Sequence, residues 1–414
     1  MKKKLKTIFS PRKLIIWLFI LILLIAVPQL SRPSLSQTEA LVSMMCVEKN
    51  GEEIEVAVMV LTPGEERKVN NQVYTGSGKT LGEAVGNISI MLGKEMGFAQ
   101  CEVVGFGDKI CETGVIPSID YMTRTKRVGR SAVLINFSGD AKDFADAVSK
   151  LSLEKALRLD QILHYDQRYI LSKNSNIDSF YKGYYSEISI GLMPQLKLET
   201  DGKGGAIEVA TSTSSSSSSA GGQSSSNAGD QQSKKYIIND GATCVFYKGA
   251  KRLELTPEQV KDLNVLQNNE QEGVLKVENV TDDIYTNATI VFALTKKDTH
   301  IKTRFENDRP IFEINVEVKV LVDEVIQENS DKKFLRRNKE FLTPTALSKL
   351  KESMHNKMME TIEFCKLNEI DILGIYKNFN ALNNKEFKQY YEKTKNEYLS
   401  GVEYKINLEI NSAY

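Results

Sequence analysis

The chain has 414 residues with 54 basic and 54 acidic side chains, so its formal net charge is zero. Seven of the bases and none of the acids lie in the first 34 residues, which leaves the remainder mildly acidic, with 47 bases against 54 acids. An acidic body argues against nucleic acid as a partner. The five cysteines form no C-x-x-C pair, so we expect buried thiols rather than a disulfide framework or a zinc site.

The N-terminus carries a strongly apolar segment behind a basic flank. Leu14–Val27 is an unbroken run of 14 apolar residues, and it reaches 17 residues when extended to Leu30. A membrane-spanning helix needs about 17 to 25 residues, and a basic flank favours the cytoplasmic side. We expect residues 1–34 to be a basic flank and a retained membrane anchor. A cleaved signal peptide is the open alternative, and both place the body outside the cytoplasm.

Residues 36–158 predict an α/β domain. Asn50-Gly51 separates two strand-like segments and predicts a hairpin. The segments that follow alternate between helix and strand patterns, which favours a mixed sheet with helices on one or both faces. They are a helix over 79–94, a strand over 101–106, a helix over 116–124, a strand over 131–138 and a helix over 140–151.

Gly76-Ser77-Gly78-Lys79-Thr80 resembles half of a phosphate-binding loop. Such a loop needs a further glycine five positions before Gly78, but Val73 stands there. The glycines are therefore expected to form a turn that opens a helix, and no nucleotide or other cofactor is expected. Phosphotransfer at Lys79 is kept as a remote enzymatic alternative. None of the three histidines, at positions 164, 300 and 355, has a partner at metal-ligand spacing, so no metal site is expected either.

The second half of the chain predicts a linker and a further domain. Residues 159–285 form a middle region, and its serine-rich part, 201–233, is too polar to bury a core and is predicted to be disordered. Residues 286–414 predict an α+β domain, an antiparallel sheet with two packed helices. Its expected elements are strands over 289–295, 299–306 and 311–322, helices over 343–365 and 385–398, and a closing strand over 402–410.

Several motifs in this order resemble one known family. They are Gly78–Val85, Glu102–Gly107, Gly114–Ile116, Ile119–Arg124, Gly241–Lys248 and Ile370–Ile375. The succession resembles the Ger(x)C family, the C subunits of bacterial spore germinant receptors. The resemblance implies a non-enzymatic subunit that contacts other, multi-span receptor subunits at the outer face of the inner spore membrane. An exported, membrane-anchored binding or envelope-assembly module without a spore role is the alternative.

Two features depart from the family. Its members are typically lipoproteins with an acylated cysteine, but no cysteine precedes Cys46, which suggests that the apolar segment replaces the lipid. Gln100 stands where the family usually has histidine. For the contact with other subunits, the candidate residues are Gly105, Gly107, Gly114 and Arg124.

Overall fold

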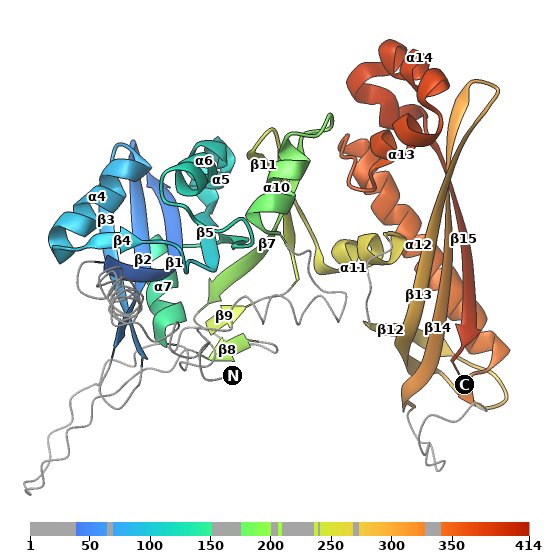
Figure 1. The fold of residues 1–414 in the computed structure, drawn as a ribbon. Coiled ribbons are helices and arrows are strands. Elements are labelled where there is room, and N and C mark those ends of the chain that lie inside the picture. Colours follow the sequence, from blue (N-terminus) through green and yellow to red (C-terminus); the bar gives the residue numbers. More distant parts are fainter. Residues whose placement is uncertain are drawn as a thin grey trace, which may run out of the picture.

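The computed structural model shows two bodies side by side (Figure 1). It describes residues 39–63, 69–150, 175–199, 206–208, 236–238, 241–267, 273–327 and 341–413. The predicted anchor at 1–34 and most of the serine-rich segment lie outside these ranges. Within them, no helix is long and apolar enough to cross a membrane.

The first body is built on an 11-stranded mixed sheet. Its main strand order is β11-β10-β7-β6-β5-β1-β2-β3, with β4 beside β1 and β9 between β7 and β8. The four middle strands, β7, β6, β5 and β1, run parallel, and antiparallel strands extend the sheet on both sides. The strands are β1 (Glu39–Asn50), β2 (Glu53–Pro63), β3 (Val69–Gly78), β4 (Glu95–Gly97), β5 (Val103–Gly107), β6 (Val133–Phe137), β7 (Ile190–Glu199), β8 (Ala206–Glu208), β9 (Tyr236–Ile238), β10 (Thr243–Tyr247) and β11 (Ala250–Leu255).

Helices cover both faces of this sheet. One face packs against α4 (Leu81–Leu92), α5 (Asp108–Thr113), α6 (Ile116–Arg124) and α10 (Ile177–Tyr184), and the other packs against α7 (Ala141–Lys150). Strand β1 is apolar on both sides for this reason: Met45 belongs to the first core and Met44 to the second. The predicted mixed α/β sheet is confirmed.

The predicted hairpin at Asn50-Gly51 is confirmed, because β1 pairs antiparallel with β2 and Gly51 has a φ of 63°. The predicted turn at Gly76–Gly78 is wrong. These residues end the edge strand β3, where they pair with Val56, Glu55 and Ile54. Inside the segment predicted to be disordered, residues 206–208 form the short strand β8.

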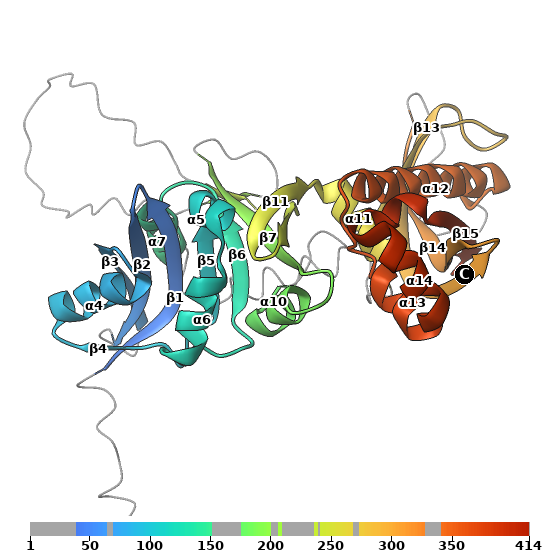
Figure 2. The same cartoon turned by 90° about the horizontal axis from the view of Figure 1, so that it is seen from above.

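The second body has a four-stranded sheet in the order β12-β13-β14-β15. Helix α12 lies along one face of it (Figure 2) and buries a stripe from Leu350 to Cys365. The predicted antiparallel sheet with packed helices differs at one edge, because β15 joins β14 in parallel after the helices. A short helix, α13, was not predicted. The elements are α11 (Pro257–Leu266), β12 (Gly273–Val280), β13 (Ala288–Glu306), β14 (Arg309–Ile326), α12 (Pro344–Leu367), α13 (Ile375–Leu382), α14 (Asn384–Thr394), the 3-10 helix η3 (Lys395–Gly401) and β15 (Glu403–Ser412).

The strands predicted over 289–295 and 299–306 are one strand, β13. Lys296, Lys297 and Asp298 interrupt the apolar alternation, which is why the sequence suggested a break. Nζ of Lys297 instead donates to the carbonyls of Asn264 and Gln267 at the end of α11, at 2.5 and 2.7 Å. The charge is therefore accommodated without ending the strand, although the register shifts between Leu294 and Lys296.

The two bodies share apolar contacts where the β10–β11 hairpin meets α11. Val245 and Leu255 belong to the same core as α12 and β14. The predicted domain limits, 36–158, 159–285 and 286–414, stay predictions. Hydrogen bonding places β7, β10 and β11 in the first sheet and β12 in the second.

Candidate functional site

The stretch from Gly105 to Gly114 comprises the end of β5 and the short helix α5. Gly105 and Gly107 lie in β5 and are buried. A Cβ atom at Gly107 would lie 1.9 Å from Oε2 of Glu48, and one at Gly105 would lie 3.0 Å from the ring of Phe137. These glycines therefore allow close packing inside the sheet. The predicted partner contact at Gly105, Gly107, Gly114 and Arg124 stays a prediction, and of these residues Gly114 and Arg124 are the ones that are not buried.

Gly114 connects α5 to α6 and has a φ of 115°. The next backbone N–H, that of Val115, donates to the carbonyl of Gly249 at 2.9 Å. Gly249 lies in the turn between β10 and β11, and a Cβ atom there would approach Cγ1 of Ile116 to 2.5 Å. The connection from α5 to α6 is thus seated on a hairpin that lies more than 100 residues away in the sequence.

Arg124 lies in the last turn of α6, at the rim of a groove of about 840 Å³ between α6 and α10. The groove lies on the side of the sheet that α4, α5 and α6 cover. Its lining combines basic, acidic and tyrosine side chains: Asp120, Thr123, Arg124, Arg127, Val128, Arg130, Asp178, Tyr181, Lys182 and Tyr185.

The groove carries an excess of positive charge. Arg124 pairs with Asp120, and Lys182 pairs with Asp178 at 2.6 Å. Arg127 and Arg130 are exposed and have no ion-pair partner within the ranges that the structure describes. Arginine suits carboxylate recognition because its planar guanidinium donates two parallel hydrogen bonds.

Two tyrosines form the wall that α10 contributes. The rings of Tyr181 and Tyr185 lie 5.7 Å apart, and Tyr185 is 75% exposed. The hydroxyl of Tyr181 lies 3.4 Å from Oγ1 of Thr123 on α6. Burial raises the pKa of Tyr181, so this hydroxyl stays protonated at neutral pH. Exposed tyrosines beside arginines are typical of protein interfaces.

A buried polar cluster lies on the first sheet, where β6, β7, β10 and β11 contribute its side chains. Asn136 is fully buried on β6, and its Nδ2 donates to the carbonyl of Phe106 at 3.0 Å. Its Oδ1 accepts from Gln195, Cys244 and Lys251 at 3.2, 3.1 and 3.3 Å. This cluster was not predicted from the sequence. Its only signal was a lone amide in an otherwise apolar strand.

The cysteines are all buried, as predicted. Burial raises the pKa of the Cys101, Cys244 and Cys365 thiols to about 12, and it raises the pKa of Cys46 and Cys111 as well. Thiols in this state are protonated at neutral pH and are poor nucleophiles.

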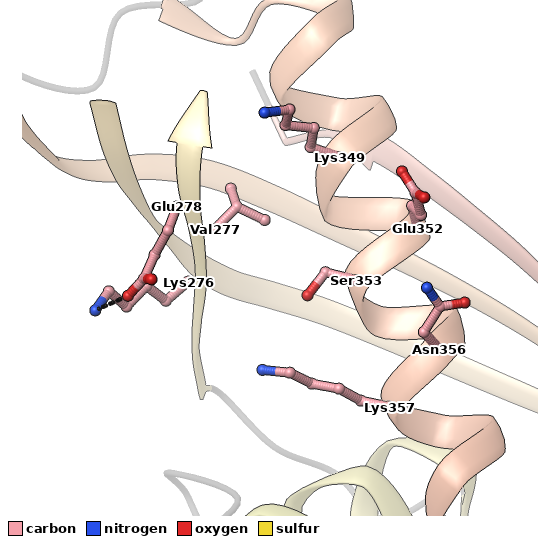
Figure 3. A pocket seen from close by; sticks show the side chains of 8 residues that line it. All are labelled: Lys276, Val277, Glu278, Lys349, Glu352, Ser353, Asn356 and Lys357. Atoms are coloured by element: carbon pink, nitrogen blue, oxygen red, sulfur yellow. Dashed lines mark ion pairs between the residues drawn. The ribbon is translucent and has the colours of Figure 1, made fainter. Parts of the chain in front are cut away.

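A second groove lies in the other body, between the edge strand β12 and α12 (Figure 3), with a volume of about 470 Å³. Lys349, Ser353 and Lys357 point from α12 toward β12. Nζ of Lys349 donates to the carbonyl of Asn279 on the edge of this sheet. Lys276 and Glu278 pair with each other at 2.6 Å, so the uncompensated charge on the α12 side is basic.

The glycines before α4 have a packing role. A Cβ atom at Gly76 would lie 2.6 Å from the carbonyl of Ala84, and one at Gly78 would lie 2.8 Å from the backbone N of Ala84. Oγ1 of Thr80 caps α4 by accepting from the N–H of Glu83 at 3.1 Å. The residues on either side of Lys79 therefore serve helix packing and capping.

No group of three metal-ligating side chains forms within the described part of the chain. His300 is exposed and lies 3.3 Å from Asp298, a lone contact on β13. His164 lies outside the described residues.

Two family models match the chain, one on each side of the serine-rich segment. Residues 36–198 match "Spore germination protein N-terminal domain", and residues 242–412 match "Spore germination B3/ GerAC like, C-terminal". The chain belongs to the GerAC family of spore germination proteins. This is the Ger(x)C family of germinant receptor C subunits that the sequence motifs resemble.

One solved structure is also similar to this GerAC-family chain. The crystal structure of the GerBC protein aligns with 15% sequence identity and a TM-score of 0.47, covering 89% of this chain and 97% of the other. No curated protein matches the chain.

The GerAC motif at Ile370–Ile375 has a structural role. Asp371 is buried, and its carboxylate accepts from the N–H groups of Ile375 and Tyr376 at 2.6 and 2.7 Å and from the hydroxyl of Tyr398 at 2.6 Å. Burial raises the pKa of Asp371. Gly374 has a φ of 71°, which favours glycine. The motif therefore starts α13 and fixes the end of α12 against the helices that follow.

Proposed function

We propose that the chain is a non-enzymatic, membrane-tethered subunit of a germinant receptor complex. It acts through contacts with multi-span subunits at the outer face of the inner spore membrane. The observation that carries the proposal is the pair of family matches, at 36–198 and 242–412, because together they include both bodies. Gly114 and Arg124 belong to the proposed contact surface.

The groove between α6 and α10 supports a role in contact. Its arginines at 127 and 130 are left without ion-pair partners in the described ranges, and exposed Tyr185 offers a rigid apolar surface beside them. An arginine and tyrosine combination of this kind is enriched where binding energy concentrates.

The protonated thiols and the packing role of the residues around Gly76 support a non-enzymatic function. The residues around Lys79 cap and pack α4, and the five thiols lie inside the cores. The predicted tether rests on the sequence of residues 1–34, where a basic flank precedes the apolar run.

A charge reversal at the groove tests the proposed contact. Arg124→Glu combined with Arg127→Glu replaces two positive charges by two negative ones at exposed positions, so the fold should be retained. We expect the amount of receptor subunits that co-purifies with the tagged chain from detergent-solubilised spore membranes to fall by about tenfold or more. Like charges that face each other across an interface cost several kcal/mol, and each 1.4 kcal/mol is a factor of about ten in affinity. Nutrient-triggered germination should slow in parallel.

The matched control reverses two exposed lysines elsewhere on the same body. Lys79→Glu with Lys142→Glu changes the net charge equally, but these residues lie at the start of α4 and on α7. Equal co-purification in the two variants would remove the groove from the proposed contact. If the unaltered chain co-purifies with no multi-span subunit at all, the alternative of a free-standing exported module would be favoured.

A further inference from the structure

The chain enters its first body beside the C-terminal end of α4. Glu39 is the first residue of β1, and it pairs with Glu95, the first residue of β4. Helix α4 ends at Leu92, and Gly93 caps it with a φ of 62°. The last turn of α4 is therefore next to the point where the N-terminal segment joins the fold.

This last turn exposes two adjacent apolar side chains. Ile90 is 80% exposed and Met91 is 58% exposed, whereas Leu81, Ala84, Val85 and Ile88 of the same helix are buried. Within the described residues, Ile90 and Met91 are the one pair of sequence neighbours among the large apolar side chains that are strongly exposed. A single exposed apolar residue is ordinary, whereas two successive ones at the end of a helix together offer an apolar surface to a partner.

The length of chain before Glu39 limits how far this tip can lie from a membrane. Eight residues, 31–38, separate Leu30 from Glu39. A fully extended chain spans at most about 3.3 to 3.6 Å per residue, so the connection reaches about 30 Å or less. A short tether raises the effective concentration of the body at the bilayer, and a small apolar contact is then sufficient to orient it.

The charges around the tip favour an apolar contact rather than an electrostatic one. Lys94 and Glu95 follow the Gly93 cap, are both exposed, and carry opposite charges. Figures 1 and 2 both place α4 and β4 at the end of the first body that is far from the second body. A surface resting on this end would leave the C-terminal body clear.

We infer that Ile90 and Met91, on the last turn of α4, insert into the interface of the lipid leaflet next to the anchor. The partner is the lipid surface itself, met by apolar side chains at the level of the headgroup and acyl-chain boundary. The inference rests on the membrane tether of the proposed function. It adds an orientation, because two attachment points fix which end of the first body faces the bilayer.

Tryptophan fluorescence in the full-length chain tests this contact. Trp17 is the single tryptophan, and it lies within the predicted anchor. In a Trp17→Phe background, Met91→Trp places the sole fluorophore on the tip. Leu367→Trp places it at the end of α12, at a position that is 81% exposed in the second body. Each protein is reconstituted in phosphatidylcholine bilayers with ordinary or acyl-brominated lipids, because bromine quenches tryptophan only at short range.

We expect brominated lipid to lower the emission of Met91→Trp by roughly twofold or more, since an interfacial side chain reaches the start of the acyl chains. The emission of Leu367→Trp should stay unchanged. Ile90→Trp is a second reporter that should behave like Met91→Trp. Quenching of both tip reporters no greater than that of Leu367→Trp would overturn the inference.

The unaltered chain separates the two possible failures. Quenching of Trp17 without quenching at position 91 would mean that the anchor is inserted and the tip is not, so only the further inference falls. If Trp17 itself is not quenched, the membrane tether of the proposed function is wrong, and the inferred contact of Ile90 and Met91 with the lipid is wrong as well.

Discussion

Neighbouring side chains on β1 are both buried, whereas neighbouring side chains on β14 alternate between a core and a polar surface. Met44 and Met45 point to opposite faces of the first sheet, and helices cover both. On β14, Ile314 is buried under the helices, and Glu317 on the other face is exposed. Helices therefore cover both faces of the first sheet, whereas within the described residues one face of the second sheet is exposed to solvent.

The open face of the second sheet is stabilised by polar pairs across its strands. Asn407 of β15 donates to Glu313 and Asn315 of β14 at 3.1 and 2.9 Å, and Arg304 of β13 pairs with Glu313. Such pairs contribute little individually and tolerate exchange. Most of the stability of the second body should therefore come from the single face under α12.

Core truncations on β1 should have the largest effect. Met44→Ala and Met45→Ala each remove a buried side chain on one face, and each should lower the free energy of unfolding by about 2 to 5 kcal/mol. Urea unfolding of the detergent-solubilised full chain, followed by circular dichroism, measures the loss.

Truncations on the two faces of β14 should differ in their effect on the free energy of unfolding. Ile314→Ala should also cost about 2 to 5 kcal/mol, whereas Glu317→Ala should stay within about 0.5 kcal/mol of the unaltered chain. A large loss from Glu317→Ala would mean that the open face is covered by something, and the contrast between the sheets would disappear.

Close packing of helices on the first sheet gives the next effect. Gly76→Ala would place a methyl group 2.6 Å from the carbonyl of Ala84 and 2.7 Å from Cγ1 of Ile88. Helix α4 must then shift away from β3, and overpacking of this kind costs about 1 to 3 kcal/mol. Hydrogen exchange should rise in α4 and β3 and stay unchanged in the second body. Unchanged exchange in α4 would show that the contact is loose.

A buried acid should make the second body sensitive to pH. Burial raises the pKa of Asp262 on α11 from its ordinary value of 3.8 to about 6, although a hydrogen bond from Thr361 at 2.9 Å opposes the shift. The folded state binds the proton of Asp262 more tightly than the unfolded state does. The contribution of protonated Asp262 to the free energy of unfolding is therefore fully present below about pH 4, and it is lost as the pH rises to about 6.

Asp262→Asn cannot ionise and should lack this loss. Relative to the unaltered chain, the variant should gain about 1 to 2 kcal/mol between pH 4 and pH 7, after allowance for solvent screening. Urea unfolding at the two pH values measures the difference. The same difference in the free energy of unfolding between the two proteins at both pH values would contradict the raised pKa of Asp262.

Local patterns in the sequence were sufficient to predict elements that are determined by residues close together in the chain. The hairpin at Asn50-Gly51 was predicted from two neighbouring residues, and it is present. The strand predicted over 311–322 likewise lies within β14. These features depend on residues within a few positions of one another, so pattern and propensity determine them.

The features that the sequence did not predict depend on distant residues. Strand β13 continues past Lys297 because carbonyl groups at the end of α11 accept hydrogen bonds from its ammonium group. The buried side chain of Asn136 is satisfied by hydrogen bonds from Cys244 and Lys251. The close packing at Gly105 and Gly107 could not be predicted either, because only the fold shows what lies against them. For the candidate site, Arg124 was identified, but the tyrosine wall of α10 was not.

The smallest expected effect is a gain in stability at Gly86, in the middle of α4. A Cβ atom there meets nothing within 4 Å, in contrast to Gly76 on the strand beneath it. Gly86→Ala should therefore raise the free energy of unfolding by about 0.5 to 1 kcal/mol, since alanine restricts the unfolded chain and favours the helix. The measurement is the same urea unfolding used for Gly76→Ala. Opposite signs at these two glycines would show that close packing of α4 is confined to its contact with β3. A loss at Gly86 would instead indicate that the outer side of α4 is also covered.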